Sequence, residues 1–330
     1  MNYEEKNNSA VNDTAENSVP ESKAPGFLKN LSPKAKIAII AGAAVVLVGI
    51  IVVIALLAGN NGGDSGSAWP PVVNVSSETL YVDKVENIPN DFIMGMDASC
   101  VPALEASGVK YYDYDGTEKD VYQILSENGI NYIRVRVWND PFDKNGNGYG
   151  GGNCDIENAV EVGKRATQYG MKLLVDFHYS DFWADPAKQM APKAWEGMDS
   201  TEMSDALYQY TKESLQKLVD AGVDIGMVQV GNETNGYMCG FKGWLDITKL
   251  MKAGSKAVRE VCPDALIAVH FANPEKVTNY KNYSYHLAAQ QVDYDVFATS
   301  YYPFWHGTLD NLASVLNQVA DTYGKKTMIA

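Results

Sequence analysis

The sequence predicts an α/β fold: a (β/α)8 barrel, or TIM barrel, that ends within or just after its seventh strand and follows a transmembrane helix. From residue 92 onward, short runs rich in β-branched and aromatic residues alternate with amphipathic helical patterns, which indicates parallel strands joined by helices. Before them, residues 37–58 form one apolar run without a charged side chain, which indicates a membrane span.

The first 80 residues divide into three segments by composition. Residues 1–36 are polar and lack the apolar side chains that would offset the entropy of ordering, so we expect a disordered tail. As a helix, residues 37–58 would extend roughly 33 Å, enough to cross the ~30 Å hydrocarbon core of a bilayer. A cleaved signal peptide is the alternative, although its apolar region is usually shorter. Residues 59–80, rich in Gly, Ser and Asn, are typical of a linker.

The flanking charges predict how the span is oriented. Lys29, Lys34 and Lys36 precede the apolar run, whereas the segment directly after it carries only Asp64. Because positively charged flanks stay in the cytoplasm, we expect a cytoplasmic tail and an extracellular domain over residues 81–330. The sequence therefore predicts a single-pass protein of the cell membrane.

The strands and helices of the predicted barrel follow one another in regular alternation. We expect strands at 92–97, 132–138, 171–178, 225–233, 266–272, 294–302 and 326–330. We expect helices at about 117–128, 157–169, 201–221, 244–260, 274–290 and 308–323. A doubly wound open sheet is the alternative, but no Gly-rich phosphate loop follows the first strand. The prediction is a barrel that is one repeat short.

Charged side chains alternate with apolar ones on two predicted strands. Arg134 and Arg136 share one face of the strand at 132–138, and Asp176 and His178 share one face of the strand at 171–178. Buried charges persist only when they are paired, so these residues are expected to face one another inside the barrel. For Arg134, which lies deeper, a purely structural ion network inside the barrel is the alternative. Arg136, Asp176 and His178 lie nearer the mouth and favour a role in orienting a catalytic carboxylate or substrate.

The strand at 225–233 ends in Asn232-Glu233 and is followed by a turn at Gly236. A carboxylate at the last residue of a parallel strand lies at the mouth of a barrel, where such folds keep their catalytic residues. The alternative is that Asn232 and Glu233 cap a following helix.

Five segments in register resemble one enzyme family: FIMGMDASC, INYIRVRVWNDP, LLVDFHYSDFWADP, MVQVGNE and TSYYPFWHG. They are similar to the arabinogalactan endo-β-1,4-galactanases, glycoside hydrolase family 53, in the clan of retaining (β/α)8 glycosidases. The resemblance covers about residues 81–330 and implies that Glu233 is the acid/base. It implies that the nucleophile is a glutamate directly after Ala330, so residues 1–330 alone are expected to be inactive.

The resemblance also implies an extracellular enzyme that hydrolyses β-1,4-galactan with retention and needs no cofactor. Another β-1,4-glycanase activity of the same clan, on mannan or cellulose, is one alternative, and a non-catalytic carbohydrate-binding surface protein is another. Tyr302 is expected to hydrogen-bond the nucleophile. The expected substrate-binding residues, chosen from the matched segments and their places at strand ends, are Asp97, Arg136, Trp138, Asp176, His178, Asn232, Tyr302, Trp305 and His306.

Composition and spacing argue against several other ligands. The net charge of −14 and pI near 4.7 disfavour nucleic acid, which requires a basic face. The loop at 143–153 begins like a calcium loop with Asp143, but Cys154 stands where the bidentate glutamate belongs. The histidines lack zinc-site spacing, so no metal is expected. We expect a monomer whose partners are galactan and, through residues 37–58, the membrane.

Four cysteines in an extracellular domain permit three complete pairings. Cys100, Cys154 and Cys239 follow predicted strands at the upper end of the barrel, whereas Cys262 precedes a strand at the lower end. Cys262 is therefore not expected to pair with Cys239. Cys100 and Cys154, in neighbouring loops, are the predicted disulfide.

Overall fold

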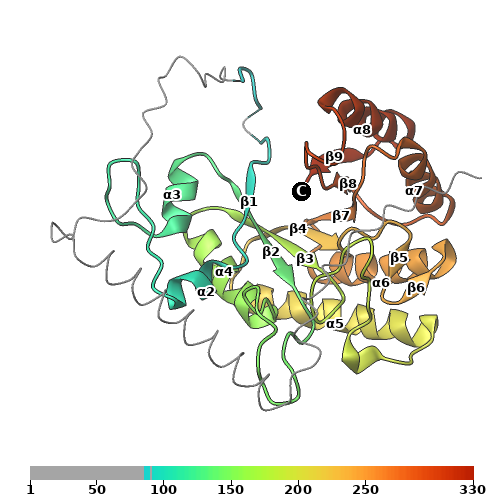
Figure 1. Ribbon diagram of the computed structural model, residues 1–330, viewed down its shortest axis with the longest axis horizontal. Helices are drawn as coiled ribbons and strands as arrows, with labels where there is room; N and C mark the ends of the chain where they lie inside the picture. The colour runs from blue at the N-terminus through green and yellow to red at the C-terminus, as the bar shows by residue number, and fades with distance from the viewer. Residues whose placement is uncertain (1–84, 90) are drawn as a thin grey trace, which may run out of the picture. The chain divides into compact units, whose positions relative to one another are not determined.

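A parallel sheet of seven strands organises the computed structural model, which describes residues 85–89 and 91–330 (Figure 1). Its strands are β1 Gly95–Asp97, β2 Tyr132–Val137, β3 Lys172–Phe177, β4 Ile225–Val230, β7 Leu266–Phe271, β8 Val296–Thr299 and β9 Lys326–Ile329. They pair in the order β1-β2-β3-β4-β7-β8-β9, so neighbours in the sheet are also successive strands of the sheet along the chain. In a doubly wound sheet, the strands would not follow their order in the chain across the whole sheet, because the direction of winding reverses near the middle. The sheet is therefore barrel-like, as predicted.

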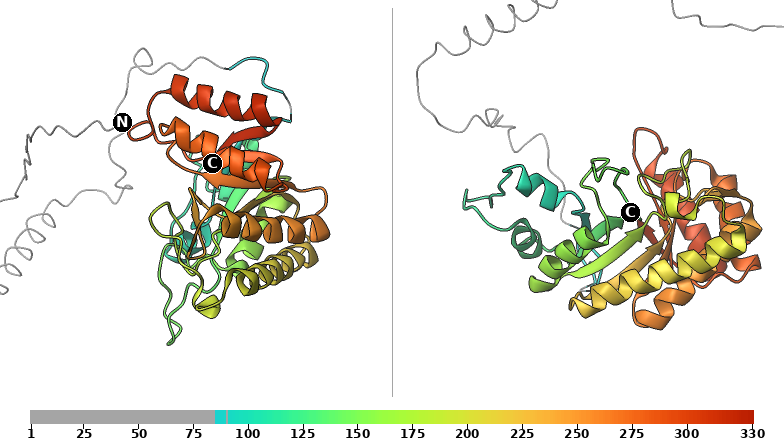
Figure 2. Two further views of the ribbon diagram at one scale, coloured as in Figure 1. Left: turned by 90° about the vertical axis from the view of Figure 1, so that its right-hand side faces the viewer. Right: turned by 90° about the horizontal axis from the view of Figure 1, so that it is seen from below.

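Helices lie along the outer face of the curved sheet (Figure 2). They are α2 Val101–Ala106, α3 Val121–Glu127, α4 Ile156–Gln168, α5 Ser200–Asp220, α6 Trp244–Val261, α7 Val277–Ala289 and α8 Leu309–Tyr323. Asp120, Asp155, Asp199 and Thr308 precede four of them, and each side chain accepts a backbone N–H of the first turn. The predicted helices are confirmed from α3 to α8.

Three short elements were not predicted. These are α2, the 3₁₀ turn Lys193–Trp195, and the hairpin of β5 Tyr237–Met238 and β6 Phe241–Lys242. Each is too short for its hydrophobic residues to repeat, and periodicity is the signal that sequence analysis detects. The last two elements lie in the loops that follow β3 and β4.

Two apolar layers hold the strands in place. On the outer face, Ile133, Val135 and Val137 of β2 belong to one continuous core with the helices. On the inner face a smaller apolar cluster fills the lower end of the sheet, formed by Leu174, Met227, Ala268 and Val296. The predicted alternation of β2 and β3 is confirmed by this arrangement.

Polar residues lie directly above the inner apolar layer. Two positions beyond Leu174 comes Asp176, and two beyond Met227 comes Gln229, because alternate residues of a strand share a face. The parallel register places Asp176 between Arg136 on β2 and Gln229 on β4. The sheet therefore carries a polar layer across several strands, just below its mouth.

No helix in the described part of the chain is long and apolar enough to cross a membrane. The tail at 1–36, the apolar run at 37–58 and the linker at 59–80 all lie outside the described residues.

Candidate active site

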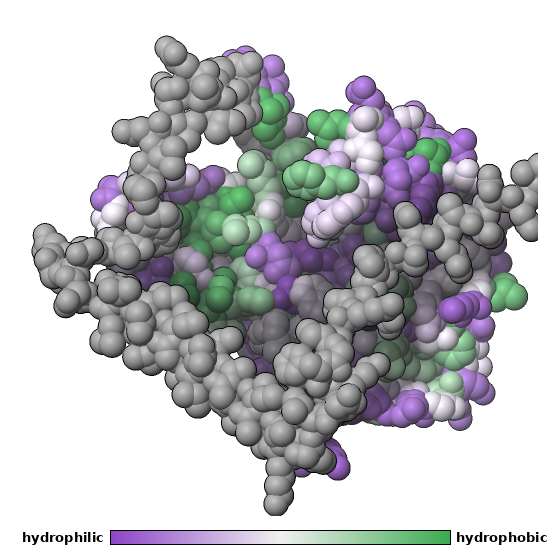
Figure 3. Space-filling view, viewed as in Figure 1, coloured by the Kyte–Doolittle hydropathy of each residue, from purple (hydrophilic) through white to green (hydrophobic). Residues whose placement is uncertain are grey.

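Glu233 lies at the mouth of the barrel-like sheet. β4 ends at Val230, and the chain then leaves the strand through Gly231, whose φ is +87°. Glu233 itself has a φ of +48°, in the left-handed region that non-glycine residues rarely adopt. Its carboxylate faces a pocket of about 630 Å³. Figure 3 shows hydrophilic surface at the centre of this view of the described residues, flanked by hydrophobic surface.

Seven of the predicted site residues line this pocket. They are Asp97, Arg136, His178, Asn232, Glu233, Tyr302 and Trp305. The pocket also contains residues that the sequence analysis did not assign to the site, namely Arg134, Trp183, Asp185, His270 and Ser300. Ala330, the residue after β9, lines the same pocket.

The remaining predicted residues lie behind the lining. Asp176 is completely buried beneath the pocket, and His306 is buried behind Tyr302, whose backbone N–H donates to His306 Nδ1 at 3.0 Å. Trp138 is also fully buried, because Phe182 and Trp183 pack over it with ring centroids 4.7 and 5.6 Å away. The prediction that Trp138 contacts substrate is therefore corrected: its ring is covered.

Asp176 is the centre of a buried network. It accepts from Arg134 at 2.8 Å, from Gln229 Nε2 at 2.5 Å and lies 3.0 Å from His178 Nε2. Burial alone would raise the pKa of Asp176, but the positive charge of Arg134 and the contact with His178 outweigh it, so the pKa is lowered. The carboxyl is therefore ionised.

Arg134 connects this network to the mouth. Besides Asp176, it contacts Asp97 at 3.3 Å and donates to Asn232 Oδ1 at 3.1 Å. A structural ion network was the alternative for Arg134, and a role at the mouth was expected for Arg136. The single Arg134 side chain serves both roles: it pairs with buried Asp176, and it lines the pocket.

The backbone of Asn232 and Glu233 is held from the side by Gln189. This buried side chain donates through Nε2 to the carbonyl oxygens of Asn232, at 2.7 Å, and Glu233, at 3.3 Å. Asn232 Nδ2 in turn donates to the backbone oxygen of Ala184 at 2.8 Å. The loop after β3 therefore fixes the turn that presents Glu233. No pattern in the sequence distinguishes Gln189 from any other loop glutamine.

Burial raises the pKa of the Glu233 carboxyl, and nearby Asp185 acts in the same direction. Ser300, which lies 2.5 Å from Glu233 Oε1, acts in the opposite direction, as do His178 and His306. The net effect is an increase, so protonated Glu233 is favoured relative to a glutamate in water. A carboxyl with a raised pKa is what a general acid requires.

Aromatic rings and Arg136 form one wall of the site. The Arg136 guanidinium lies 4.3 Å from the centroid of the Trp183 ring, a cation–π contact, and 3.6 Å from Asp97. Trp183 and Trp305 expose 43% and 72% of their surface at the rim. Flat exposed rings above charged groups are suited to a neutral, polyhydroxylated ligand.

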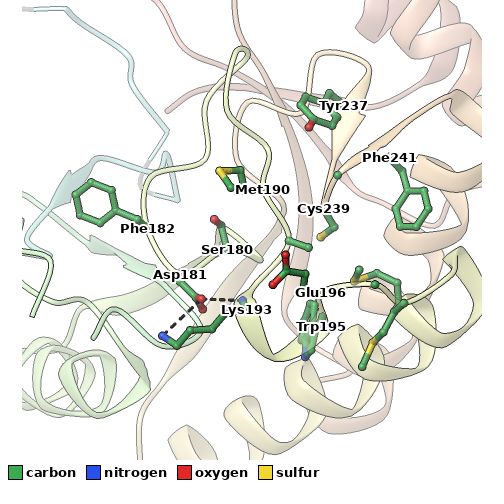
Figure 4. Close-up of a pocket in the computed structure, with 15 residues that line it drawn as sticks. Ser180, Asp181, Phe182, Met190, Lys193, Trp195, Glu196, Tyr237, Cys239 and Phe241 are labelled. Atoms are coloured by element: carbon green, nitrogen blue, oxygen red, sulfur yellow. Dashed lines mark hydrogen bonds and ion pairs between the residues drawn. The ribbon is translucent and has the colours of Figure 1, made fainter. Parts of the chain in front are cut away.

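A second pocket lies in the loops after β3 and β4 (Figure 4). Phe182, Trp195, Tyr237 and Phe241 line it, and Asp181 accepts from the backbone N–H of Lys193 at 2.8 Å. It shares no lining residue with the pocket that contains Glu233.

The predicted disulfide is not formed, and the cysteines of the described part are free thiols. Cys100 and Cys154 do lie near one another, but each thiol contacts the carbonyl oxygen of Gly151, at 3.2 and 3.3 Å. Arg136 donates to Cys100 Sγ at 2.8 Å. The prediction is corrected: both thiols share the Gly151 carbonyl oxygen as a partner and are not bonded to one another.

In the loop at 143–153, the carboxylate of Asp143 accepts hydrogen bonds from other residues of the same loop. Asp143 accepts the backbone N–H groups of Asn145 and Asn147 at 2.8 and 2.9 Å and the side-chain amide of Asn147. Within residues 85–89 and 91–330, no group of three or more His, Cys, Asp or Glu residues is arranged to hold a metal ion.

The buried network yields a first prediction. Asp176→Asn should lower the free energy of unfolding by about 3 kcal/mol, because it leaves the charge of Arg134 without its buried partner. Chemical denaturation measures this, and Asp205→Asn, an exposed site on α5, is the matched control with an expected change below about 0.5 kcal/mol. Equal losses in both variants would show that the ion pair does not stabilise the fold.

A second prediction concerns Glu233 and pH. The folded state raises its pKa above the unfolded value of 4.5, so ionised Glu233 costs stability at pH above the folded value. Glu233→Gln should therefore raise Tm at pH 7, and the gain should disappear as pH falls below about 4.5, where both states are protonated. Thermal melts across pH test this, with exposed Glu213→Gln as the control. A lower Tm of Glu233→Gln at pH 7 would contradict the raised pKa.

Comparison with known proteins gives a consistent result. Residues 93–330 match the model of glycosyl hydrolase family 53. The chain is 56% identical to an endo-β-1,4-galactanase of Bacillus subtilis over 259 residues, which are 78% of this chain and 60% of that protein. It is 33% identical to an arabinogalactan endo-β-1,4-galactanase of Humicola insolens, covering 71% of this chain and 72% of that one.

Solved structures show the same fold. The family 53 catalytic domain of Ignisphaera aggregans superposes with a TM-score of 0.73 at 40% identity, over 76% of this chain and 70% of that chain. A fungal β-1,4-galactanase gives a TM-score of 0.65 at 33% identity, over 72% of each chain. The chain thus spans 60% of the length of its Bacillus relative and shares both sequence and fold with the group. It belongs to glycosyl hydrolase family 53.

Proposed function

We propose that residues 81–330 belong to the catalytic domain of an endo-β-1,4-galactanase, a glycoside hydrolase that cleaves β-1,4-galactan. The observation that carries this proposal is Glu233, a half-buried carboxyl with a raised pKa at the end of β4, facing an open pocket. The names of the Bacillus and Humicola relatives support galactan as the substrate.

The proposed reaction retains the anomeric configuration. Retaining glycosidases use two carboxyl groups about 5 to 5.5 Å apart, one as nucleophile and one as acid and then base. Glu233 is the acid/base in this proposal, and the residue that follows Ala330 carries the nucleophile. The sheet supports that placement, because the Ala330 N–H donates to Thr299 O at 2.9 Å, next to Ser300, which contacts Glu233.

The other pocket residues would bind and orient the sugar chain. Trp183, Tyr302 and Trp305 are exposed rings at the rim that can pack on sugar faces. Asp97 presents carboxylate oxygens that can accept from hydroxyl groups, and Asn232 Nδ2 has one hydrogen beyond its bond to Ala184 O. Asp176, His178 and Arg134 hold these side chains in place from below.

The third prediction tests this assignment in a protein that extends through the position after Ala330. Glu233→Gln should lower turnover of β-1,4-galactan by roughly two to four orders of magnitude, because the amide cannot donate or accept the catalytic proton. Galactan oligosaccharide binding should change only a few fold. Reducing-sugar assays and calorimetry measure the two quantities, with Glu213→Gln as the control for the substitution.

A panel of β-1,4-linked galactan, mannan and cellulose separates the alternatives. Galactan should be hydrolysed fastest, and the first product seen by proton NMR should keep the β configuration. Faster cleavage of mannan or cellulose would contradict the substrate, and binding without any hydrolysis would identify a carbohydrate-binding protein. Full turnover by Glu233→Gln would exclude it as the acid/base.

We propose in addition that the enzyme acts outside the cell as a membrane-tethered monomer. Residues 1–36 would form a cytoplasmic tail, 37–58 the membrane helix and 59–80 the linker. The length of the apolar run and the lysines on its N-terminal side support this orientation.

The fourth prediction tests that topology. Protease added to intact cells should remove the domain after residue 59 and leave an epitope on residues 1–36 intact, since only the domain is exposed. Cells with disrupted membranes are the control, in which both should be digested. Protection of the domain in intact cells would contradict the extracellular location.

A further inference from the structure

The hydroxyl of Ser300 lies between two groups that compete for one proton. Its Oγ is 2.5 Å from Oε1 of Glu233 and 3.0 Å from Nε2 of His270. Ser300 and His270 are both buried. A serine hydroxyl has one proton to donate and can accept on its other side. The direction of these two hydrogen bonds therefore depends on which ring nitrogen of His270 carries hydrogen and on whether Glu233 is protonated.

His270 is a neutral imidazole. Burial, followed by the nearby charge of Arg134, lowers the pKa of His270 to about 3, although Asp176 acts against this. At neutral pH the ring therefore carries a single proton, on either Nδ1 or Nε2.

The surroundings of Nδ1 decide where that proton lies. Nδ1 is 2.8 Å from Oδ1 of Asn232. That atom is the oxygen of the amide, because Arg134 donates to it at 3.1 Å and Asn232 Nδ2 donates to Ala184 O. An oxygen that already accepts from a guanidinium attracts Nδ1 at this distance only if Nδ1 carries hydrogen. The proton is therefore on Nδ1, and Nε2 has a free lone pair.

Two longer contacts of Nδ1 do not change this assignment. Gln229 Nε2 lies 3.2 Å away, and the backbone N–H of Glu233 donates toward Nδ1 at 3.3 Å. That longer contact favours an Nδ1 without hydrogen, but such an Nδ1 would place two lone pairs 2.8 Å apart, because Asn232 Oδ1 can only accept. The Gln229 amide has better partners for both of its protons, the carboxylate of Asp176 at 2.5 Å and Gly231 O at 3.1 Å. The shorter contact with Asn232 is the one that determines the tautomer.

We propose that the Ser300 hydroxyl turns between His270 Nε2 and Glu233 Oε1 as Glu233 gains and loses its proton. When Glu233 is protonated, it donates to Ser300 Oγ, and Ser300 donates to Nε2. When Glu233 is ionised, Ser300 donates to the carboxylate. Ser300 and His270 are positioning residues, and this inference rests on the proposed role of Glu233 as acid/base.

The switch suits a carboxyl group that changes its role within one catalytic cycle. In the first step the O–H of Glu233 turns from Ser300 Oγ to the leaving oxygen and gives up its proton there, and the Ser300 hydroxyl turns toward the new carboxylate. In the second step Glu233 removes a proton from the attacking water, and the hydroxyl turns back to Nε2. No proton leaves Ser300 or His270, so each transfer needs only rotations of the Ser300 hydroxyl and of the Glu233 O–H. Glu233 keeps one hydrogen-bond partner in both states.

The fifth prediction is spectroscopic and needs no turnover. In the full chain with ¹⁵N-labelled histidine, Nδ1 of His270 should carry hydrogen and Nε2 should not, at every pH above about 5. The Nε2 signal should shift as Glu233 titrates, with the midpoint that a ¹³C carboxyl label reports for Glu233, because ionised Glu233 withdraws the Ser300 proton from Nε2. The chain has four histidines, so the signals can be assigned by single substitutions.

A matched pair of serine variants isolates the hydroxyl from the surrounding charges. Asp185, His178 and His306 also face Glu233 and remain present in both variants. Ser300→Ala should abolish the link between the Nε2 signal and Glu233, whereas Ser284→Ala, a buried serine on α7 that donates to Tyr280 O, should preserve it. If Ser300→Ala fails to fold, the position of the hydrogen on His270 in the unsubstituted protein still tests the inference.

Two results would overturn the inference: hydrogen on Nε2 of His270, or an Nε2 signal that stays constant while Glu233 titrates. These results are separate from those that test the proposed function. If the protein shows the expected signals but does not hydrolyse galactan, the rotation of the Ser300 hydroxyl is supported and the galactanase assignment is wrong. If the protein hydrolyses galactan but carries hydrogen on His270 Nε2, the galactanase assignment is supported and the rotation of the Ser300 hydroxyl is wrong.

Discussion

The ion pair between Arg134 and Asp176 is the interaction on which the mouth of this domain depends. Asp176 is fully buried, and an isolated buried carboxylate would be costly, so its place requires Arg134 at 2.8 Å and the donor on Gln229. The same guanidinium then donates to Asn232, which precedes Glu233. The position of the proposed acid/base is therefore linked, through two side chains, to a charge balance beneath the pocket.

The parallel sheet makes this layering possible. Sequential strands in register bring every second residue to one inner face, so an apolar layer at Leu174 and Met227 lies beneath a polar layer at Asp176 and Gln229. The side chains of the apolar layer are buried, and a low-dielectric neighbour strengthens the charged contacts above it. His270, on the next strand, is buried within the same polar layer and remains neutral.

The sequence predicted what repeats and missed what depends on single contacts. The strands and longer helices were found because their apolar residues recur at regular spacing, and Glu233 because it lies just beyond a strand, although β4 ends at Val230 and not at Glu233 as predicted. Ser300 and His270 are 30 residues apart, and only the pairing of β7 with β8 brings them together. Trp138 was correctly placed at a strand end, but no pattern reveals that Phe182 and Trp183 cover it. The predicted Cys100–Cys154 disulfide failed for a similar reason, since proximity alone does not determine which partner each thiol takes.

The left-handed backbone at Glu233 lowers the conformational stability of the turn, and it directs the Glu233 carboxyl into the pocket. A non-glycine residue at a φ of +48° carries roughly 1 kcal/mol or more of conformational strain, which the Gln189 contacts and the Thr234 N–H to His270 O must offset. Glycine would relax the turn, and a residue in an extended conformation would point its side chain elsewhere. A substitution that removes the strain at Glu233 would therefore also remove the backbone conformation that directs the carboxyl into the pocket. At this turn, greater stability would lower activity.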